Sequence, residues 1–334
     1  MTDSTRDRNR GGGDGRPESD PDSEAVLADG ESLAPEEVAR VAREDARVVV
    51  PESAREAVRT ARERVEEVVE SGDPVYGVNT GFGELVDERI PREDVEQLQL
   101  NLVRSHAAGA GRELAREEVR ALLLGRLNAL VKGYSGVRES VVDLLAAMLN
   151  ERIHPVVKSR GSLGASGDLA PLAHLALVLV GEGEADVEMD GETHRMDGAD
   201  ALAAANLEPL TLRAKEGIAL INGTQLTVGL AALAVVDAER AVRTADVAGS
   251  LTTEVTMGTT ASADESIAAV RPHAGHAESA RNVKLLTRDS EVVESHRNCD
   301  RVQDAYSIRC LPQVHGAVRD AIAHLREAVE VELN

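Results

Sequence analysis

Three small residues in one loop, Ala165, Ser166 and Gly167, could react with one another through their backbone. If the N–H of Gly167 attacks the carbonyl carbon of Ala165, a five-membered ring closes, and the loss of two waters leaves a methylidene-imidazolone. Glycine supplies an unhindered nitrogen, alanine a small electrophilic neighbour, and serine the exocyclic CH₂. A helix is expected to begin directly after the loop, and its positive end would make this alkene a stronger electrophile.

The same loop, GSLGASGDLAPL at 161–172, also allows a conformational interpretation. Ser166 or Asp168 could cap the helix that begins at Leu169, with the glycines adopting positive φ. Two other glycine-rich sites do not fit, because the loop lacks the lysine of a phosphate-binding P-loop and misses the G-x-S-x-G of a hydrolase elbow by one position. The residues alone leave a ring-forming loop and a capping loop as the alternatives.

Two further loops interrupt the helical pattern, YGVNTGFG at 76–83 and VQDAYSIRC at 302–310. Loops held on a rigid frame are where functional residues tend to lie. In the second loop, the guanidinium of Arg309 could bind a carboxylate through two parallel hydrogen bonds. The alternative for Arg309 is a surface ion pair, since the chain has 59 acidic residues.

Metal and disulfide chemistry have little support in the sequence. His273 and His276 have a spacing that could hold a metal ion, but no third ligand accompanies them, and we predict no metal. Cys299 and Cys310 match neither a metal-site pair nor a disulfide framework. We expect both to be reduced thiols.

The elements that must position these loops are predicted to be helices. Aromatic residues make up only 1% of the chain, so a core of Ala, Val and Leu is expected, which suits close-packed helices. Apolar spacing of three and four residues predicts a mainly α fold, a bundle of long helices. We expect helices at 35–46, 51–71, 91–108, 114–132, 136–151, 168–181, 213–247 (with Asn222-Gly223 as a candidate break), 275–287 and 312–334, and a β-hairpin at 186–195 around Asp190-Gly191.

The two ends of the chain differ in character. Residues 1–30 are polar, charged and rich in glycine, and they are predicted to be a disordered tail because they cannot repay the entropy of folding. One helical domain is expected over 31–334. The helix at 312–334 reaches the last residue without a glycine stop or a polar tail, so we expect this domain to be incomplete at its C-terminus.

The charge balance limits the partners. A net charge of −22 argues against nucleic acid, whose phosphates need clustered cations. Only four of the 37 cationic residues are lysines, and such an acid-rich surface suits a protein kept soluble in concentrated salt. The longest apolar stretch, 169–180, is too short to span a bilayer. We therefore expect a cytoplasmic protein of a salt-rich cell, without a membrane partner.

The segment GSLGASGDLAPLAHLAL at 161–177 resembles the signature of the aromatic amino acid ammonia-lyases, in which Ala-Ser-Gly matures into the methylidene-imidazolone (MIO) group. The resemblance extends from about residue 31 to residue 334. It is carried by further segments in the family's order: YGVNTGFG at 76–83, NLVRSHAAGAG at 101–111, KEGIALINGTQ at 215–225, RPHAGH at 271–276 and RVQDAYSIRCLPQVHG at 301–316.

This resemblance implies a role for each loop. The MIO group of Ala165-Ser166-Gly167 would capture the substrate amine, without metal or nucleotide, and Tyr76 would remove the β-proton. Arg309 would bind the substrate carboxylate and Gln303 would contact the substrate. Tyr306 would help to form or orient the ring. Asn222 would donate a hydrogen bond to the ring and stabilise the charge that develops there.

The residues around His106 resemble the histidine-specific branch, in which L-histidine loses ammonia to give trans-urocanate, the first step of histidine degradation. Relatives that act on phenylalanine have apolar residues at this place, whereas those that act on tyrosine also use a histidine. The resemblance further implies a homotetramer whose sites draw residues from three subunits. The alternatives are a tyrosine or phenylalanine ammonia-lyase or aminomutase, or a catalytically inactive, truncated helical scaffold.

Overall fold

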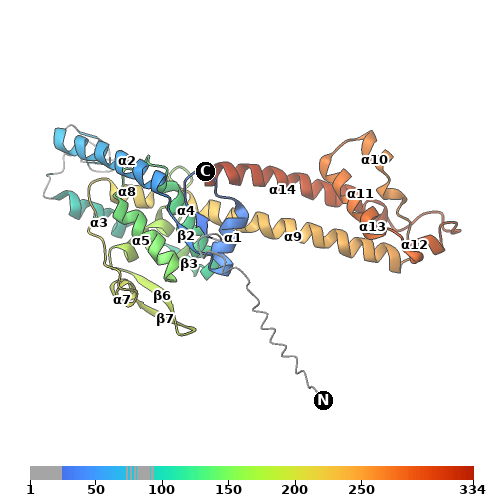
Figure 1. Cartoon of the computed structure of the whole chain (residues 1–334), viewed down its shortest axis with the longest axis horizontal. Coiled ribbons are helices and arrows are strands. Elements are labelled where there is room, and N and C mark those ends of the chain that lie inside the picture. Colours follow the sequence, from blue (N-terminus) through green and yellow to red (C-terminus); the bar gives the residue numbers. More distant parts are fainter. Residues whose placement is uncertain (1–24, 73, 76, 79, 81–90, 92–93) are drawn as a thin grey trace, which may run out of the picture.

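The computed structural model describes residues 25–72, 74–75, 77–78, 80, 91 and 94–334, and these form a mainly α protein, as predicted (Figure 1). The helices are α1 Pro35–Glu44, α2 Glu52–Ser71, α3 Val95–His106, α4 Arg116–Val131, α5 Glu139–Asn150, α6 Leu169–Leu179, α7 Gly198–Ala204, α8 Glu216–Ile221, α9 Gln225–Val255, α10 Glu265–Val270, α11 Ala274–Leu286, α12 Glu291–Ser295, α13 Tyr306–Arg309 and α14 Leu311–Leu333.

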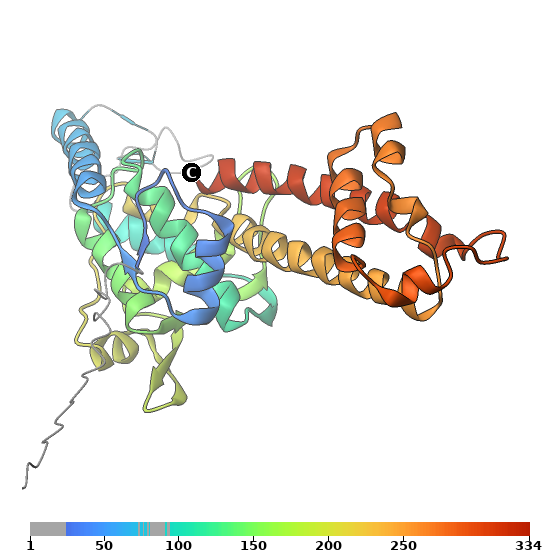
Figure 2. The ribbon, with the colours of Figure 1, turned by 45° about the vertical axis from the view of Figure 1, so that its right-hand side comes forward.

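The helices form a head and an arm (Figures 1 and 2). The head contains α1 to α8, and α4 lies at its centre, packed against α1, α5 and α9. The arm consists of α9 and α14, which run side by side in opposite directions, with α10 to α13 gathered at the far end. Helix α9 therefore connects the head to the far end of the arm.

Sequence pattern explains which helices are central. Helix α4 contains the run ALLLGRLNALV and is buried on almost all sides, as expected for a helix that is apolar all round. Helix α2 has an apolar stripe instead, and only Ala54, Val58, Ala61 and Val65 are buried. It therefore covers the surface of the head. No helix among the described residues is both long enough and apolar enough to cross a membrane.

Small sheets join the helices of the head. Strands β1 (Val26–Leu27) and β2 (Val48–Val49) pair in parallel. Strands β3 (Ala110–Glu113) and β5 (Lys158–Arg160) pair antiparallel, and the third sheet has the order β4 (Ile153–Pro155), β6 (Glu184–Met189), β7 (Glu192–Asp197). Strands β6 and β7 confirm the predicted hairpin, with positive φ at Asp190 and Gly191 as an Asp-Gly turn requires.

The boundary of the predicted tail was placed too late in the chain. Residues 1–24 lie outside the described residues, but 25–30 are structured: Val26 and Ala28 are fully buried, and the Gly30 N–H donates to Asn128 Oδ1 at 2.9 Å. Composition missed this segment because two strand residues are too few to show alternation. The helix predicted at 213–247 is interrupted at Asn222-Gly223-Thr224, and its longer part, α9, continues to Val255.

Candidate active site

The Ala165-Ser166-Gly167 segment forms the tip of a tight turn between β5 and α6. The Leu163 N–H donates to the Gly167 carbonyl at 2.8 Å, and the Gly167 N–H donates back to the Leu163 carbonyl at 2.8 Å. Gly164 and Ala165 are exposed, while Ser166 and Gly167 are partly buried. The turn therefore places these three residues at or near the surface of the helical head.

Gly167 touches the break between α8 and α9. Its φ is +88°, and a Cβ at this position would lie 2.2 Å from the Gly223 carbonyl oxygen. The two glycines form an isolated parallel bridge, and the Asp168 N–H donates to the Gly223 carbonyl at 2.6 Å. Only glycine fits such a close approach of two backbones.

Asn222 directs its side chain at the loop. Its Nδ2 donates to the Ser166 carbonyl oxygen at 3.0 Å. If the ring closes between Ala165 and Gly167, this oxygen becomes the ring carbonyl, which takes up negative charge when a nucleophile adds to the alkene. A donor on that oxygen is what such a group needs, so the residues present fit a methylidene-imidazolone.

The capping interpretation of the loop is not what the structure contains. Asp168 occupies the N-cap position of α6, but its side chain makes no capping bond. Its buried carboxylate instead accepts from Ser162 Oγ at 2.6 Å and from the N–H and Oγ1 of Thr227 at 2.9 and 3.0 Å. Asp168 thus ties both ends of the loop to the first turn of α9.

His106 is the last residue of α3. Its Nδ1 lies 2.8 Å from the Leu102 carbonyl oxygen and 3.1 Å from Ser105 Oγ. Helix α3 packs against α6, which follows the loop, and against α8, which precedes Asn222. The chain after His106 enters β3, whose pairing with β5 leads directly back to the loop.

The 302–310 segment presents its polar side chains together on one surface. Gln303, Tyr306 and Arg309 are exposed. The Arg309 guanidinium lies 5.3 Å from the centroid of the Tyr306 ring, a cation–π arrangement, and its Nε donates to the Asp304 carbonyl at 3.1 Å. Within the described part of the chain, no carboxylate contacts Arg309, which leaves its fork open to a ligand.

These two groups of residues lie at opposite ends of α9. Asn222 precedes its first turn, whereas the buried Asp304 carboxylate accepts from the Thr259 N–H at 2.7 Å, just beyond its last turn. At about 1.5 Å per residue, a helix of this length separates them by roughly 45 Å. One chain therefore does not bring Gln303, Tyr306 and Arg309 to the Ser166 loop (Figure 1). Tyr76, the predicted base, lies outside the described residues.

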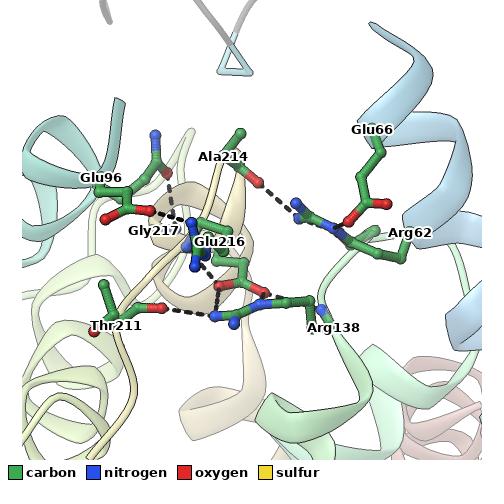
Figure 3. Close-up of polar contacts among 11 residues, drawn as sticks. Arg62, Glu66, Glu96, Arg138, Thr211, Ala214, Glu216 and Gly217 are labelled. Atoms are coloured by element: carbon green, nitrogen blue, oxygen red, sulfur yellow. Dashed lines mark hydrogen bonds and ion pairs between the residues drawn. The ribbon is translucent and has the colours of Figure 1, made fainter. Parts of the chain in front are cut away.

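The sequence did not reveal the ion pair between Arg138 and the buried Glu216 at the start of α8, the helix that precedes Asn222. Glu216 is fully buried and accepts from Arg138 Nε and Nη2 at 2.9 and 2.7 Å and from the Arg213 N–H at 2.7 Å (Figure 3). Burial opposes ionisation, but the Arg138 hydrogen bonds keep the pKa of Glu216 below its ordinary value. A charged residue within an apolar run, as in EGIALI, was the available signal.

The described residues contain no group of three or more side chains that could hold a metal ion. The fold and the loop together define a class of mainly α proteins in which a glycine-containing loop is set against a helix break. The sequence profile of the aromatic amino acid lyases matches residues 33–334. The chain belongs to the aromatic amino acid lyase family.

Known proteins agree with this assignment. The chain is 66% identical over 312 residues to a probable histidine ammonia-lyase of Halobacterium salinarum and 52% identical over 309 residues to a histidine ammonia-lyase of Gloeobacter violaceus. These matches cover 93% and 92% of this chain but only 59% of each relative, so the chain spans about three fifths of their length.

Solved structures share the fold. A tyrosine aminomutase from Streptomyces globisporus superimposes with a TM-score of 0.85 at 40% identity, over 92% of this chain and 61% of that one. A histidine ammonia-lyase from Trypanosoma cruzi superimposes with a TM-score of 0.82 at 36% identity, over 92% of this chain and 56% of that one. The predicted long-helix lyase fold is confirmed by these neighbours.

Proposed function

We propose that this chain provides the ring-forming loop of a histidine ammonia-lyase, which converts L-histidine into trans-urocanate and ammonia. The observation that carries the proposal is the hydrogen bond from Asn222 Nδ2 to the Ser166 carbonyl oxygen, at 3.0 Å, in a loop that only glycine can close at position 167. The relatives named histidine ammonia-lyase, at 66% and 52% identity, support histidine as the substrate.

The residues of the proposed site have different roles in this reaction. Once formed from Ala165-Ser166-Gly167, the MIO group supplies an electrophile for the substrate amine. Arg309 binds the substrate carboxylate through its fork, and Gln303 contacts the substrate. Tyr76 takes the β-proton, for which its pKa must fall from near 10. Tyr306 helps to form or orient the ring.

Asn222 and His106 act at the head of the molecule. Asn222 holds the Ser166 carbonyl oxygen and offsets the charge that develops there. His106 contributes to substrate choice from the end of α3. Its position on α3 supports this role, because α3 packs against α6, which follows the loop, and against α8, which precedes Asn222.

The proposed enzyme works as an assembly of copies, a homotetramer in the cytoplasm. Arg309 and Ser166 lie far apart in one chain, so a complete site needs Arg309 from another copy. Exposed apolar side chains along the arm support a partner surface: Val247, Leu251 and Val255 recur at four-residue spacing on α9, and Val314, Val318 and Leu325 recur at spacings of four and seven on α14. Apolar exposure of this kind marks interaction surfaces.

A second candidate is an enzyme that acts on tyrosine, as an ammonia-lyase or aminomutase. It is supported by the 40% identity and TM-score of 0.85 to the Streptomyces globisporus tyrosine aminomutase, and by a histidine at position 106, which tyrosine enzymes also use. Assays with histidine, tyrosine and phenylalanine separate the candidates, because a lyase gives a different ultraviolet-absorbing acrylate from each, whereas an aminomutase gives a β-amino acid. Turnover of tyrosine in preference to histidine would replace the first proposal.

The ring itself can be tested without turnover. The peptide that contains Ala165-Ser166-Gly167 should be lighter by two waters than its sequence in the wild-type chain, and of unmodified mass in Ser166→Ala, because alanine cannot supply the alkene. Ser166→Ala should keep the helical circular-dichroism spectrum and lose urocanate production. An unmodified wild-type peptide would overturn the proposed function and leave the inactive scaffold as the remaining alternative, whereas urocanate from Ser166→Ala would overturn the ring-dependent mechanism.

A further inference from the structure

Arg126 is a buried cation directly behind the reactive loop, on the central helix α4. Its side chain is 3% exposed. Nη1 donates to Gln225 Oε1 at 2.7 Å, and Nη1 and Nη2 both donate to the Asn222 backbone carbonyl at 3.2 Å. Among the described residues, no carboxylate forms an ion pair with Arg126. Its positive charge therefore faces only the carbonyl of Asn222 and the amide of Gln225.

An arginine also holds the other end of α8, but it is partly exposed, and it is bound differently. Arg138 pairs with the buried carboxylate of Glu216 at the first residue of the helix (Figure 3). The buried Glu216 carboxylate thus has the counter-charge that burial of an ion usually demands. Arg126 lacks one, although burial lowers its pKa only to about 10, which leaves it charged at neutral pH.

An uncompensated buried charge is costly, and a neutral side chain could fill the same space. The contacts of Arg126 indicate what a charged side chain does at this position. The carbonyl that Arg126 binds belongs to Asn222, whose side chain donates to the Ser166 oxygen at 3.0 Å. The following residue, Gly223, accepts from the Asp168 N–H at 2.6 Å. Arg126 thus binds the Asn222-Gly223 turn, which contacts the loop at Ser166 and at Asp168.

The contact lies where charge develops in the second loss of water, which completes the ring group. When Ser166 is dehydrated, its Cα proton and side-chain hydroxyl leave as water, and the electron pair of the Cα–H bond becomes the Cα–Cβ double bond. Negative charge passes onto the Ser166 carbonyl oxygen as the proton leaves, and Asn222 Nδ2 donates to this oxygen. Loss of a well-placed donor to a developing oxyanion costs about 100- to 1,000-fold in rate.

We propose that Arg126 is a positioning residue for ring formation, which holds the Asn222-Gly223 turn so that the Asn222 amide stays on the Ser166 carbonyl oxygen. The inference rests on the proposed function, since it concerns the same loop. It assigns a role to a residue that touches neither the reacting atoms nor the substrate.

The test follows the mass of the 165–167 peptide with time after synthesis or refolding, in the full chain. Arg126→Met, neutral and of similar length, should form the ring about 100-fold more slowly than wild type, the lower end of the cost of one oxyanion donor. Arg126→Lys keeps the charge but has a single nitrogen for two acceptors, and it should form the ring at an intermediate rate. Circular dichroism confirms that each variant is folded.

The matched control removes the ion pair at the other end of α8. The double variant Arg138→Met, Glu216→Gln loses a buried contact without leaving an orphan charge, so it should lower the thermal midpoint and still form the ring at the wild-type rate. If this control loses the ring as Arg126→Met does, the effect belongs to the stability of α8, and the specific role of Arg126 is overturned.

Arg126→Lys keeps the inference testable if Arg126→Met does not fold. Wild-type ring formation in a folded Arg126→Lys would contradict the inference and leave the proposed function intact. A wild-type chain that never loses two waters would overturn both. The two failures are therefore distinguishable by mass alone.

Discussion

At the scale of single residues, the contact between Gly167 and Gly223 limits what the loop can contain. A side chain at 167 would meet the Gly223 carbonyl oxygen at 2.2 Å, and the φ of +88° is one that L-residues rarely adopt. The glycine that the ring chemistry needs as a nucleophile is thus also the residue that the packing needs. Gly164, in the same loop, has open space around it.

Gly167→Ala should therefore abolish ring formation and destabilise the head. The left-handed backbone alone costs an alanine about 1–2 kcal/mol, and the contact with a backbone oxygen adds to that. Gly164→Ala is the matched control, and it should form the ring with wild-type stability, because nothing lies within 4 Å of its Cβ. Peptide mass and denaturant unfolding measure both effects. Equal behaviour of the two variants would show that the Gly223 contact does not matter.

At the scale of elements, a buried polar network joins α1, α4, α5 and β4. Arg120 on α4 is 1% exposed and donates to the Val41 and Leu149 carbonyls at 2.7 and 2.9 Å. Its Nη1 lies 3.2 Å from Nε2 of His154, and its Nη2 lies 3.3 Å from a carboxylate oxygen of Asp45. One arginine thus donates to carbonyls near the ends of α1 and α5 and contacts a side chain of β4.

His154 should make the stability of the head depend on pH. Burial, followed by the neighbouring Arg120 and Arg116, lowers its pKa from 6.5 to about 4, whereas Glu188 and Asp45 act in the opposite direction. The unfolded state then binds more protons between these values, so stability is fully present above about pH 6.5 and is lost as pH falls toward 4. The effect amounts to at most about 3 kcal/mol.

His154→Gln should lose this pH dependence, because glutamine can accept from Arg120 and does not titrate. The free energy of unfolding, measured with denaturant at pH 7 and pH 5, should fall less in His154→Gln than in wild type. The difference between the two proteins cancels the carboxylates that titrate in the same range. A fall of the same size in both would assign the pH dependence to groups other than His154.

The long helices were predictable because each buries a stripe or a full surface of apolar residues, as α2 and α4 do. The short helices α7, α10, α12 and α13 were not predicted, and α12 buries none of its residues. The short strands were not predictable either. All four residues of β3 are exposed, so no alternation marks them, and β1 has only two residues. The partners of Arg120 and Arg126 could not be predicted either, because a charge inside an apolar run shows that it is buried but not which carbonyls it meets.

At the scale of the whole molecule, the charge balance dominates. Acidic residues outnumber basic ones by 59 to 37, so ion pairs such as those of Arg43 with Glu117 and Asp237 leave an excess of negative charge. The remaining self-repulsion acts over a Debye length, which is about 10 Å at 0.1 M salt and about 3 Å at 1 M. Concentrated salt should therefore stabilise the folded state more than it weakens exposed ion pairs.

The thermal midpoint should rise from dilute buffer to 2 M KCl. Sucrose at matched osmolality is the control, since it is excluded from the surface but screens no charge, and it should raise the midpoint less. A midpoint that stays constant or falls with KCl would argue against adaptation to a salt-rich cytoplasm.

The loops of the candidate site could be recognised one by one from the sequence, but their arrangement could not. Motif order gives no distance, and only the length of α9 shows that Asn222 and Arg309 lie at opposite ends of the arm. A site shared between copies predicts complementation. Chains carrying Ser166→Ala and chains carrying Arg309→Met should each be inactive, whereas their equal mixture, assembled together, should regain about a quarter of the wild-type activity, because half of the copies supply each native residue independently.

The control for this experiment uses two residues that one copy must supply together. Tyr306 and Arg309 are in contact within a single chain, with the guanidinium 5.3 Å from the ring centroid. A mixture of Tyr306→Phe and Arg309→Met chains should therefore remain at the activity of its components, since no copy carries both native side chains. Urocanate formation measures both mixtures. If the Ser166→Ala and Arg309→Met mixture also stays inactive, these residues do not meet across copies, and the site must be completed in another way.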